Sequence, residues 1–241
     1  LKKFYPTDIL CTDRGIINLW VTRMIFSGME FMKKKPFKNI YINATVLTKD
    51  GKRMSKSLGT GIDPLYLIDK YGADAMRFGI AYQITGGQDI KFMEDNIVMG
   101  RKFCNKIWNA ARFVLQQTSI LKSETENSKP QFITPADKKI LTALSRTTRA
   151  VNLDLENYRF GGMAHRLYDF FWHDFCDSYI EKSKEQLQIS ETKRRTAKIL
   201  LYVLSTSLKV LHPIIPFITE GIYQILPIKN KKMLIIETWP K

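Results

Sequence analysis

The stretch "NIYINATVLT" (39–48), followed by "KDGKRMSKSLGTGIDP" (49–64), places an apolar, alternating segment directly before a basic loop that contains glycine. Alternation and β-branched residues predict a strand over 39–48. The segment 15–34 spaces apolar side chains at helical intervals, which predicts an amphipathic helix before that strand. Helix, strand and loop in this order form an α/β arrangement, in which ligands bind beyond the carboxyl ends of the strands. The loop is therefore a candidate ligand-binding element.

The loop concentrates positive charge and backbone freedom in a few residues. Its cations and glycines are Lys49, Lys52, Arg53, Lys56, Gly51, Gly59 and Gly61. Glycines allow a loop to move, and a lysine can bring a point charge to a phosphate. The Walker pattern G-x-x-x-x-G-K-[ST] does not occur, so a P-loop is excluded as the explanation. By composition alone, a solvated turn is the more common reading, and binding of a polyphosphate is the alternative.

Most of the remaining chain predicts helices. Asp63 as N-cap, Pro64 at the first helical position and Gly72 as the stop delimit a short helix. Further helices are predicted over 73–84, 94–121, 134–155, 160–187 and 190–211, the last capped by Ser190, and another restarts after Pro213. The apolar stripe of 94–121 includes Trp108 among its buried residues, and "MLIIETWP" (233–240) predicts a short strand or an extended tail. The fold class is mainly α with a small α/β part, and the helices form an antiparallel bundle.

Charge and cysteine content narrow the class of protein. The 38 Lys and Arg residues exceed the 23 Asp and Glu residues, for a net charge of +15, which is typical of proteins that bind nucleic acid or an anionic membrane. No apolar run approaches the ~18 residues of a spanning helix, so we expect no membrane association. Cys11, Cys104 and Cys176 are far apart, without C-x-x-C spacing, so neither a zinc site nor a disulfide framework is indicated. We expect no metal site and a cytoplasmic location.

The order of residues in the loop adds a resemblance to a known family. "RMSKS" (53–57) resembles the KMSKS signature of class I aminoacyl-tRNA synthetases. Within that class, the segments 54–92 and "RKFCNKIWNAARFVL" (101–115) are similar to valyl-tRNA synthetases, with isoleucyl and leucyl enzymes as alternatives. "FWHDFCDSYIEKSK" (171–184) and "LHPIIPFITE" (211–220) resemble the helical anticodon-binding domain of that family.

The resemblance implies three domains. Residues 1–62 would be the end of a Rossmann-type catalytic domain with the signature loop, 63–95 a connecting helical fold, and 96–241 the helical anticodon-binding domain. It also implies ATP, valine and valine tRNA as substrates or partners of the intact enzyme, with Mg²⁺, and we expect a monomer.

The resemblance assigns roles to the loop residues. Lys56 would contact the ATP phosphates during adenylate formation, Ser55 and Ser57 would shape the loop, and Met54 would anchor it. Arg53 stands where the signature has its first lysine, so it keeps the charge but not the geometry of that lysine. Lys56, Ser55 and Arg53 are therefore the candidate catalytic residues, and residues 53–57 the ATP-binding set.

The resemblance also points to the amino-acid side of the active site. Trp20, with Ile16 beside it, would border the side chain of valine, although the helical pattern alone favours Trp20 as a core residue. Gly15 stands where similar enzymes usually carry an aspartate, and Asn43-Ala44 where His-Gly is frequent. Asp13 is a candidate to replace the missing carboxylate, and the sequence alone does not decide whether it does.

Three residues of the helical half are candidates for contact with tRNA: Lys106, Arg112 and Phe113. Single-stranded bases stack on aromatic or guanidinium planes, and lysines follow the backbone charge. For Lys106 and Arg112 the alternative is a solvated helix face, and for Phe113 it is core packing.

Catalysis by class I synthetases needs a His-x-Gly-His element, which none of the three histidines of this chain provides. We therefore expect the chain to be a fragment that binds tRNA but catalyses neither adenylation nor transfer alone. The alternatives are a stand-alone tRNA-binding helical module and a helical interaction protein whose charge is coincidental.

Overall fold

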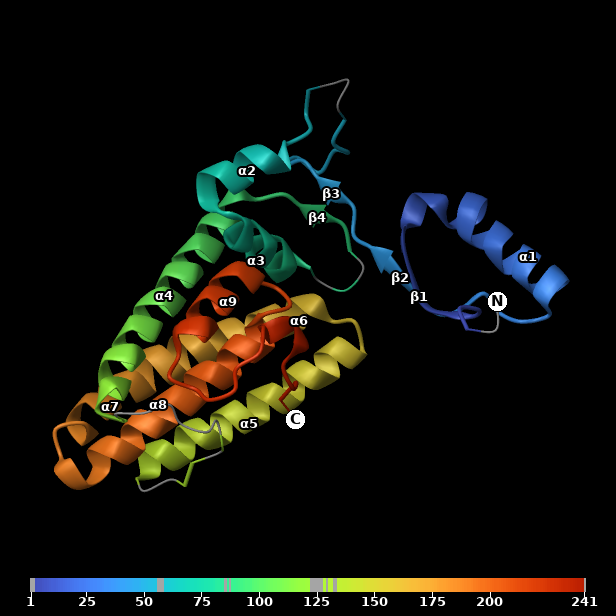
Figure 1. The fold of residues 1–241 in the computed structure, drawn as a ribbon. Helices are drawn as coiled ribbons and strands as arrows, with labels where there is room; N and C mark the ends of the chain where they lie inside the picture. The colour runs from blue at the N-terminus through green and yellow to red at the C-terminus, as the bar shows by residue number, and fades with distance from the viewer. Residues whose placement is uncertain are drawn as a thin grey trace. The chain divides into compact units, whose positions relative to one another are not determined.

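The computed structural model describes residues 3–55, 59–84, 86, 88–121, 128, 130–131 and 134–240. Two compact units account for the chain (Figure 1). The first unit comprises Leu1–Ile62 and Ile84–Met93, and the second comprises Asp63–Gln83 and Glu94–Lys241. Each unit is described by itself.

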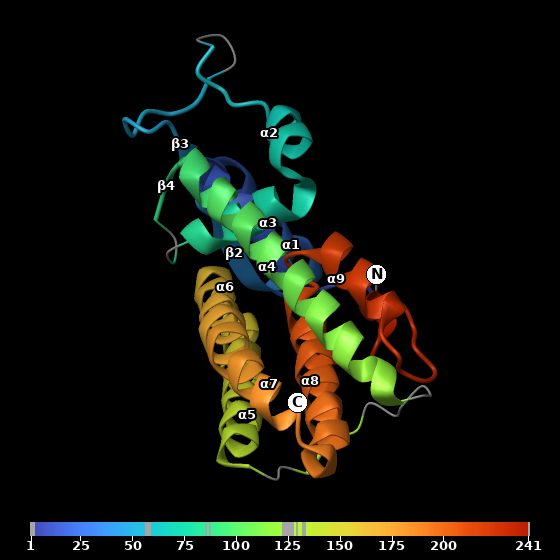
Figure 2. The ribbon, with the colours of Figure 1, turned by 90° about the vertical axis from the view of Figure 1, so that its left-hand side faces the viewer.

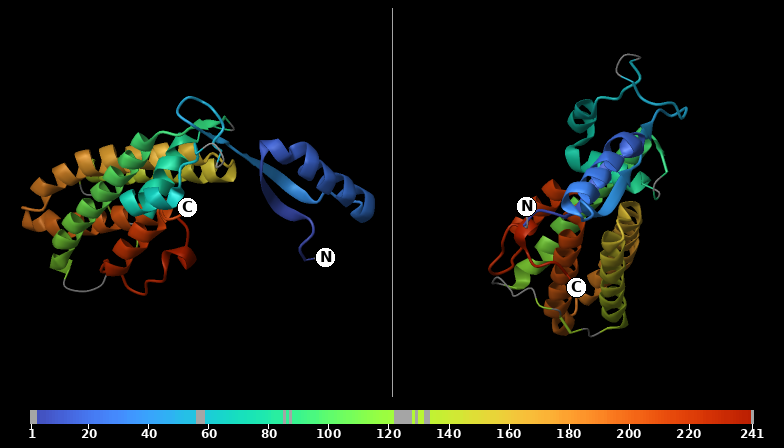
Figure 3. Two further views of the ribbon diagram at one scale, coloured as in Figure 1. Left: turned by 90° about the horizontal axis from the view of Figure 1, so that it is seen from above. Right: turned by 90° about the vertical axis from the view of Figure 1, so that its right-hand side faces the viewer.

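The first unit contains a β-α-β element. Its segments are β1 (Thr7–Asp13), η1 (Arg14–Ile16), η2 (Ile17–Val21), α1 (Thr22–Met32), β2 (Phe37–Asn43), β3 (Val46–Leu47) and β4 (Ile90–Lys91). β1 pairs with β2 in parallel, in a register that runs from Thr7 opposite Phe37 to Asp13 opposite Asn43. Parallel strands need a long crossover connection, which α1 provides here. α1 lies beside the two strands (Figure 3). β1 was not predicted, because its pairing partner is thirty positions away in the sequence.

The predicted strand 39–48 is two strands. β2 ends at Asn43, and β3 pairs in parallel with β4 in a separate sheet. The backbone N–H of Ile90 donates to Thr45 O at 2.8 Å, and that of Phe92 donates to Leu47 O at 2.9 Å. Residues 84–93 belong to the first unit because β4 pairs with β3.

The predicted amphipathic helix 15–34 is helical but does not bury its apolar residues within this unit. It begins as a 3₁₀ turn (η1), continues as a π-helix (η2) and becomes α-helical in α1. Among the described residues 17–32, the buried ones are Val21 and Gly28, whereas Leu19, Phe26 and Phe31 are exposed. The pattern predicted the conformation correctly and the burial wrongly.

The second unit is helical. Its segments are α2 (Pro64–Tyr71), α3 (Ala73–Gln83), α4 (Glu94–Thr118), η3 (Ser119–Leu121), α5 (Pro135–Glu156), α6 (Phe160–Asp169), η4 (Phe170–Ile180), α7 (Glu181–Gln186), α8 (Ser190–Leu211), α9 (Pro216–Ile225) and η5 (Leu234–Ile236). Asp63 caps α2 by accepting from Leu65 N–H, and Gly72 ends α2 at a φ of 94°, as predicted. The mainly helical fold with a small α/β part is confirmed.

The core of the bundle surrounds α8, which buries most of its residues from Thr196 onward. α4 and α5 both pack against α8 and η4, which lie between them (Figures 1 and 2). η4 continues α6 in π-helical form and contributes four large buried side chains, Phe170, Phe171, Phe175 and Tyr179. The predicted aromatic core of 160–187 is therefore present.

Two details of the helical prediction were wrong, and the structure defines two others more closely. Trp108 was predicted to be buried, but its side chain is 46% exposed. Ser190 is the first residue of α8 and makes no capping bond, the cap position being Ile189. Of the two conformations predicted for the tail, a short strand or an extended segment, the structure has an extended segment interrupted by the 3₁₀ turn η5. α9 begins at Pro216, because the Asp74 carboxylate accepts from the N–H groups of Phe217 (3.3 Å) and Ile218 (2.6 Å).

α3 and α4 approach each other more closely than any side chain would allow. A Cβ on Gly100 would lie 2.4 Å from the carbonyl oxygen of Ala75, and a Cβ on Gly79 would lie 2.7 Å from that of Asn96. Glycine is required at both positions because the obstructing atoms belong to backbone.

The substitution Gly100→Ala is therefore expected to lower the free energy of unfolding of the helical unit by roughly 1–3 kcal/mol, through forced separation of α3 and α4. The matched control is Gly221→Ala on α9, where a Cβ meets nothing within 4 Å. The control should gain about 0.5–1 kcal/mol from helix propensity. Denaturant midpoints measure both. Equal and favourable effects of the two substitutions would contradict the close-packing argument.

The three thiols differ in accessibility. Cys11 is exposed on β1, Cys104 is half-buried and Cys176 is buried. Burial raises the pKa of both Cys104 and Cys176 to about 12.

A thiol reagent at pH 8 should therefore modify Cys11 rapidly, and Cys104 and Cys176 only after unfolding, because burial keeps those two thiols protonated and covered at that pH. The variant Cys11→Ser should abolish the rapid phase. A rapid phase that persists in this variant would show that α4 or η4 opens in the native state.

Candidate nucleotide-binding loop and nucleic-acid interface

β3 leads into a tight turn that returns the chain to itself. Thr48 N–H donates to Lys52 O at 2.8 Å, and Gly51 N–H donates to Thr48 O at 2.9 Å. Gly51 adopts a φ of +81°, a conformation that favours glycine. After the turn, Arg53 pairs with Leu47 in an isolated antiparallel bridge. The basic residues 49–53 are thus held at the carboxyl end of β3.

The cations of this turn face solvent. Lys49, Lys52 and Arg53 are exposed, and within the described ranges none of them has an ion-pair partner. The Lys91 side chain adds a fourth cation, since its Cε lies 3.5 Å from where a Cβ on Gly51 would be. Lys91 was missed by sequence reasoning, because only the pairing of β4 with β3 brings it to the turn. Four exposed cations therefore surround one turn, an arrangement that suits a polyphosphate ligand.

The far side of the loop is closed by hydrogen bonds between Ser55 and Thr60. Ser55 N–H donates to Thr60 Oγ1 at 3.0 Å, and Thr60 N–H donates to Ser55 O at 3.1 Å. Met54 and Ser55 are half-buried, while Arg53 is exposed. The predicted residues Lys56 and Ser57 lie outside the described residues. The structure therefore brings Arg53, Met54 and Ser55 to one edge of the loop.

The ends of β1 and β2 carry the predicted amino-acid site. Asp13 accepts from Gly15 N–H at 2.6 Å and from Thr45 Oγ1 at 3.4 Å, so its carboxylate acts as a cap to η1 and as a link to the residue before β3. Ile16 (43% exposed) and Trp20 (58% exposed) follow β1, four positions apart on one helical face. Trp20 is not a core residue in this unit, which leaves its ring available to a ligand.

Lys106 on α4 is committed to internal partners. Its Nζ lies 2.8 Å from Asp177 Oδ1 and 5.0 Å from the centre of the Trp172 ring. Asp177 Oδ2 lies 3.2 Å from His173 Nδ1. The hydrogen bond from Lys106 lowers the pKa of Asp177, and the same bond raises the pKa of Lys106.

The solvent side of α4 carries a second group of residues. Arg101, Asn105, Trp108 and Arg112 are exposed and recur at helical spacing, so they share one face, called here the α4 face. Arg112 has no hydrogen-bond or ion-pair partner among the residues that the structure describes. Phe113 is half-buried and packs against the bundle core. Sequence reasoning missed Trp108 because its spacing also matches the apolar stripe.

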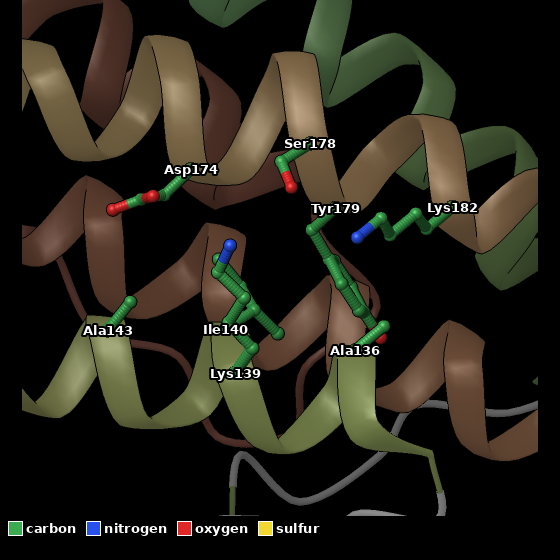
Figure 4. A pocket seen from close by; sticks show the side chains of 8 residues that line it. All are labelled: Ala136, Lys139, Ile140, Ala143, Asp174, Ser178, Tyr179 and Lys182. Carbon is green, nitrogen blue, oxygen red and sulfur yellow. The ribbon is translucent and has the colours of Figure 1, made fainter.

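A crevice between α5 and the helix η4–α7 is too small for a ligand. Its volume of about 10 Å³ suits roughly one water molecule. Figure 4 shows residues of the two helices facing each other across it, with Lys139 and Lys182 at its edge. Tyr179 closes the floor and donates to Asp137 Oδ1 at 2.8 Å, and burial raises the pKa of Tyr179. Asp137 also forms a capping box with Thr134, so this crevice is a structural junction.

Among the described residues, no group of three or more His, Cys, Asp or Glu side chains is placed to hold a metal ion. In the same part of the chain, no helix combines the length and apolar character needed to cross a membrane.

Two family models match the chain, one before α4 and one after it. Residues 1–93 match the family model of class I tRNA synthetases (I, L, M and V), and residues 137–241 match the anticodon-binding domain of tRNA ligase. Valine–tRNA ligase of *Thermotoga maritima* is 48% identical to the chain over 242 residues, and that of *Bacillus cereus* strain ATCC 10987 is 44% identical over 241 residues. The chain is homologous to valine–tRNA ligases.

The homology extends over nearly the whole chain but over a minor part of the relatives. Each of these two alignments covers at least 99% of this chain and 27% of the valine–tRNA ligase. The chain thus spans about a quarter of the length of these relatives.

Solved structures of other class I enzymes share the fold. The leucyl-tRNA synthetase of *Agrobacterium radiobacter* K84, in a ternary complex with tRNA, matches all of this chain and 29% of its own with a TM-score of 0.79 at 19% identity. Methionyl-tRNA synthetase of *Mycobacterium tuberculosis* matches 97% of this chain and 47% of its own with a TM-score of 0.80 at 18% identity. These likenesses confirm the fold class, while the valine–tRNA ligases are the nearer relatives in sequence.

Proposed function

We propose that this chain is part of a valine–tRNA ligase, in which it supplies one side of the ATP site and the surface that binds tRNA. The observation that carries the tRNA role is that Arg112, which has no ion-pair partner among the described residues, is exposed on the same face of α4 as Trp108. Homology to valine–tRNA ligases supports the reaction: ATP-dependent activation of valine and its transfer to tRNA. The three-domain division of the chain remains part of this proposal.

The basic turn would act on ATP. In adenylate formation, a carboxylate oxygen of valine attacks the α-phosphorus, and the bond from that phosphorus to the pyrophosphate oxygen breaks. Negative charge moves onto the leaving pyrophosphate, where exposed cations lower the barrier if they bind this charge more strongly in the transition state. Lys49, Lys52, Arg53 and Lys91, with Lys56 from the signature, are the groups of this chain suited to that task.

The proposed ATP site also assigns roles to the hydrogen bonds of the signature loop and to Mg²⁺. The Ser55–Thr60 hydrogen bonds would hold the base of the signature loop while its cations engage the phosphates, and Met54 would anchor it by its half-buried side chain. No carboxylate cluster of the described residues fits Mg²⁺, so we expect that ion to be bound chiefly by the ATP phosphates.

Trp20 and Ile16 would form an apolar wall for the valine side chain. Both are exposed beyond the carboxyl end of β1, where ligands of parallel sheets bind. Asp13 is held by Gly15 and Thr45, so we do not assign it to the ammonium group of valine.

The α4 face would bind single-stranded bases of tRNA. An exposed indole and a guanidinium one turn apart offer two planes on which bases stack, and Arg101 supplies charge for the backbone. Lys106 would take part by exchanging Asp177 for a phosphate. Phe113 would support the helix from the core side.

The chain alone would bind tRNA without catalysing either step, since it carries no His-x-Gly-His element. A stand-alone tRNA-binding module is the second candidate, and the same α4 face supports it. The two differ in the loop, which only the ligase role requires.

Binding of fluorescent *T. maritima* valine tRNA to this chain tests the tRNA role. Trp108→Ala and Arg112→Ala should each weaken binding, Trp108 by about 1–3 kcal/mol, the value of one stacked base. Trp108→Phe retains a ring and should lose less, and Gln188→Ala, an exposed neutral change outside α4, should have no effect. If all four variants bind alike, the α4 face does not contact tRNA.

A second tRNA with an altered anticodon tests base reading. We expect weaker binding of the altered tRNA, with a difference that survives rising salt, because base contacts release few counterions. If both tRNAs bind equally and both lose binding as salt rises, the surface attracts tRNA only by its charge and does not read bases. In a separate assay, valine-dependent exchange of pyrophosphate into ATP should be undetectable, and exchange at a rate typical of synthetases would contradict the inactivity of the isolated chain.

A further inference from the structure

A large groove lies on the outer side of α5 in the helical unit. Its volume is about 940 Å³, within the range of ligand sites. It is lined by Pro130, Gln131, Lys138, Leu141, Thr142, Ser145, Arg146, Arg149, Ala150 and Leu153. We call the cavity lined by these residues the α5 groove.

The lining combines cations and neutral hydrogen-bonding groups without a carboxylate. Lys138, Arg146 and Arg149 are exposed on the rim, and Gln131, Thr142 and Ser145 add amide and hydroxyl groups. This is the mixture of side chains that contacts phosphate and sugar in complexes with nucleic acid. In contrast, the crevice beside Lys139 includes Asp174, and the cavity beside Arg77 includes Glu237.

The two arginines of the groove are available to a ligand. Within the part of the chain that the structure describes, neither Arg146 nor Arg149 has an ion-pair partner. Arg159 and Arg166, nearby in the sequence, both bind the buried carboxylate of Asp154 at 3.0 and 2.8 Å. The carboxylate of Asp154 is therefore already neutralised by cations outside the groove.

The spacing of the cations suits a chain of phosphates better than a single anion. Arg146 and Arg149 are one turn apart, and Lys138 lies two turns before Arg146 on the same side of the helix. Eleven residues of helix separate Lys138 from Arg149, which amounts to about 16 Å. A single phosphate group cannot contact all three charges at once, whereas a polynucleotide backbone carries phosphates along such a length.

The α5 groove lies apart from the α4 face. α4 and α5 pack on opposite sides of η4 and α8 (Figure 2). A strand bound at α4 would have to pass round the bundle to reach α5, so the two surfaces are separate contacts with RNA.

We propose that the α5 groove binds the phosphate backbone of an RNA strand, as a second tRNA contact independent of the α4 face. The inference rests on the proposed tRNA binding by this chain. Arg146 and Arg149 supply the charge, and the apolar floor formed by Leu141, Ala150 and Leu153, the last 54% exposed, accommodates the ribose edge.

The test measures binding of *T. maritima* valine tRNA to the full chain by fluorescence anisotropy over a series of salt concentrations. The double variant Arg146→Ala/Arg149→Ala should bind at least about tenfold more weakly, and its dependence of log K on log salt should be shallower by about 1.4, the value for two phosphate contacts. Arg146→Lys/Arg149→Lys should retain most of the affinity. The control Lys229→Ala/Lys232→Ala removes two exposed charges outside the groove and should keep the slope of the unaltered chain.

Each other outcome decides against the groove. If Arg146→Ala/Arg149→Ala and the control Lys229→Ala/Lys232→Ala weaken tRNA binding equally, only the total charge of the chain matters. If Trp108→Ala weakens binding and the groove variant does not, tRNA binding stands and the groove contact is wrong. If the unaltered chain binds no tRNA, both proposals fail. Poly-glutamate binding that depends on Arg146 and Arg149, with tRNA binding unchanged, would identify the groove as a surface for acidic peptides.

Discussion

The close approach of α3 and α4 is the constraint on which the arrangement of the helical unit depends. Gly100 lets the backbone of α4 rest against the carbonyl of Ala75, and Gly79 repeats this contact one step along the pair. Fixing α4 against α3 fixes its rotation, which turns Ile97, Phe103 and Ile107 toward the core and leaves Trp108 and Arg112 outside.

α3 also positions the junction between α8 and α9. Asp74 caps α9, and one turn later Arg77 donates from Nε to Ile214 O at 2.7 Å and from a second nitrogen to Pro213 O at 2.9 Å. Burial raises the pKa of Asp74, while the two backbone N–H donors act in the opposite direction. A short helix early in the chain thus holds two elements that lie about 140 positions later.

Local signals predicted a large part of the fold. Asp63, Pro64 and Gly72 delimit α2 by chemistry that acts within a few residues, and Thr134 opens α5 in the same way. What sequence reasoning missed depends on distant partners. β1 exists because β2 pairs with it, and α9 starts at Pro216 because Asp74 reaches it.

The candidate site residues also divide into those that the local sequence predicted and those that depend on distant parts of the chain. Arg53, Met54 and Ser55 were found from the order of letters in one loop, without knowledge of the fold. Lys91 required the pairing of β3 with β4, and Trp108 required the rotation of α4. Periodicity could not place Trp108, because a large aromatic residue at the margin of an apolar stripe fits both the core and the surface.

The Lys106 ammonium already has an anionic partner within the protein, the carboxylate of Asp177. The carboxylate is covalently part of the same molecule and rests on Lys106 at 2.8 Å, so its local concentration is high and constant. A dissolved anion must displace this tethered competitor before it gains the lysine. An ion pair as exposed as this one is worth about 0–1 kcal/mol, so an anion that neighbouring contacts already hold can displace Asp177 at little cost. The Lys106 ammonium is thus covered by an anion that the protein itself carries.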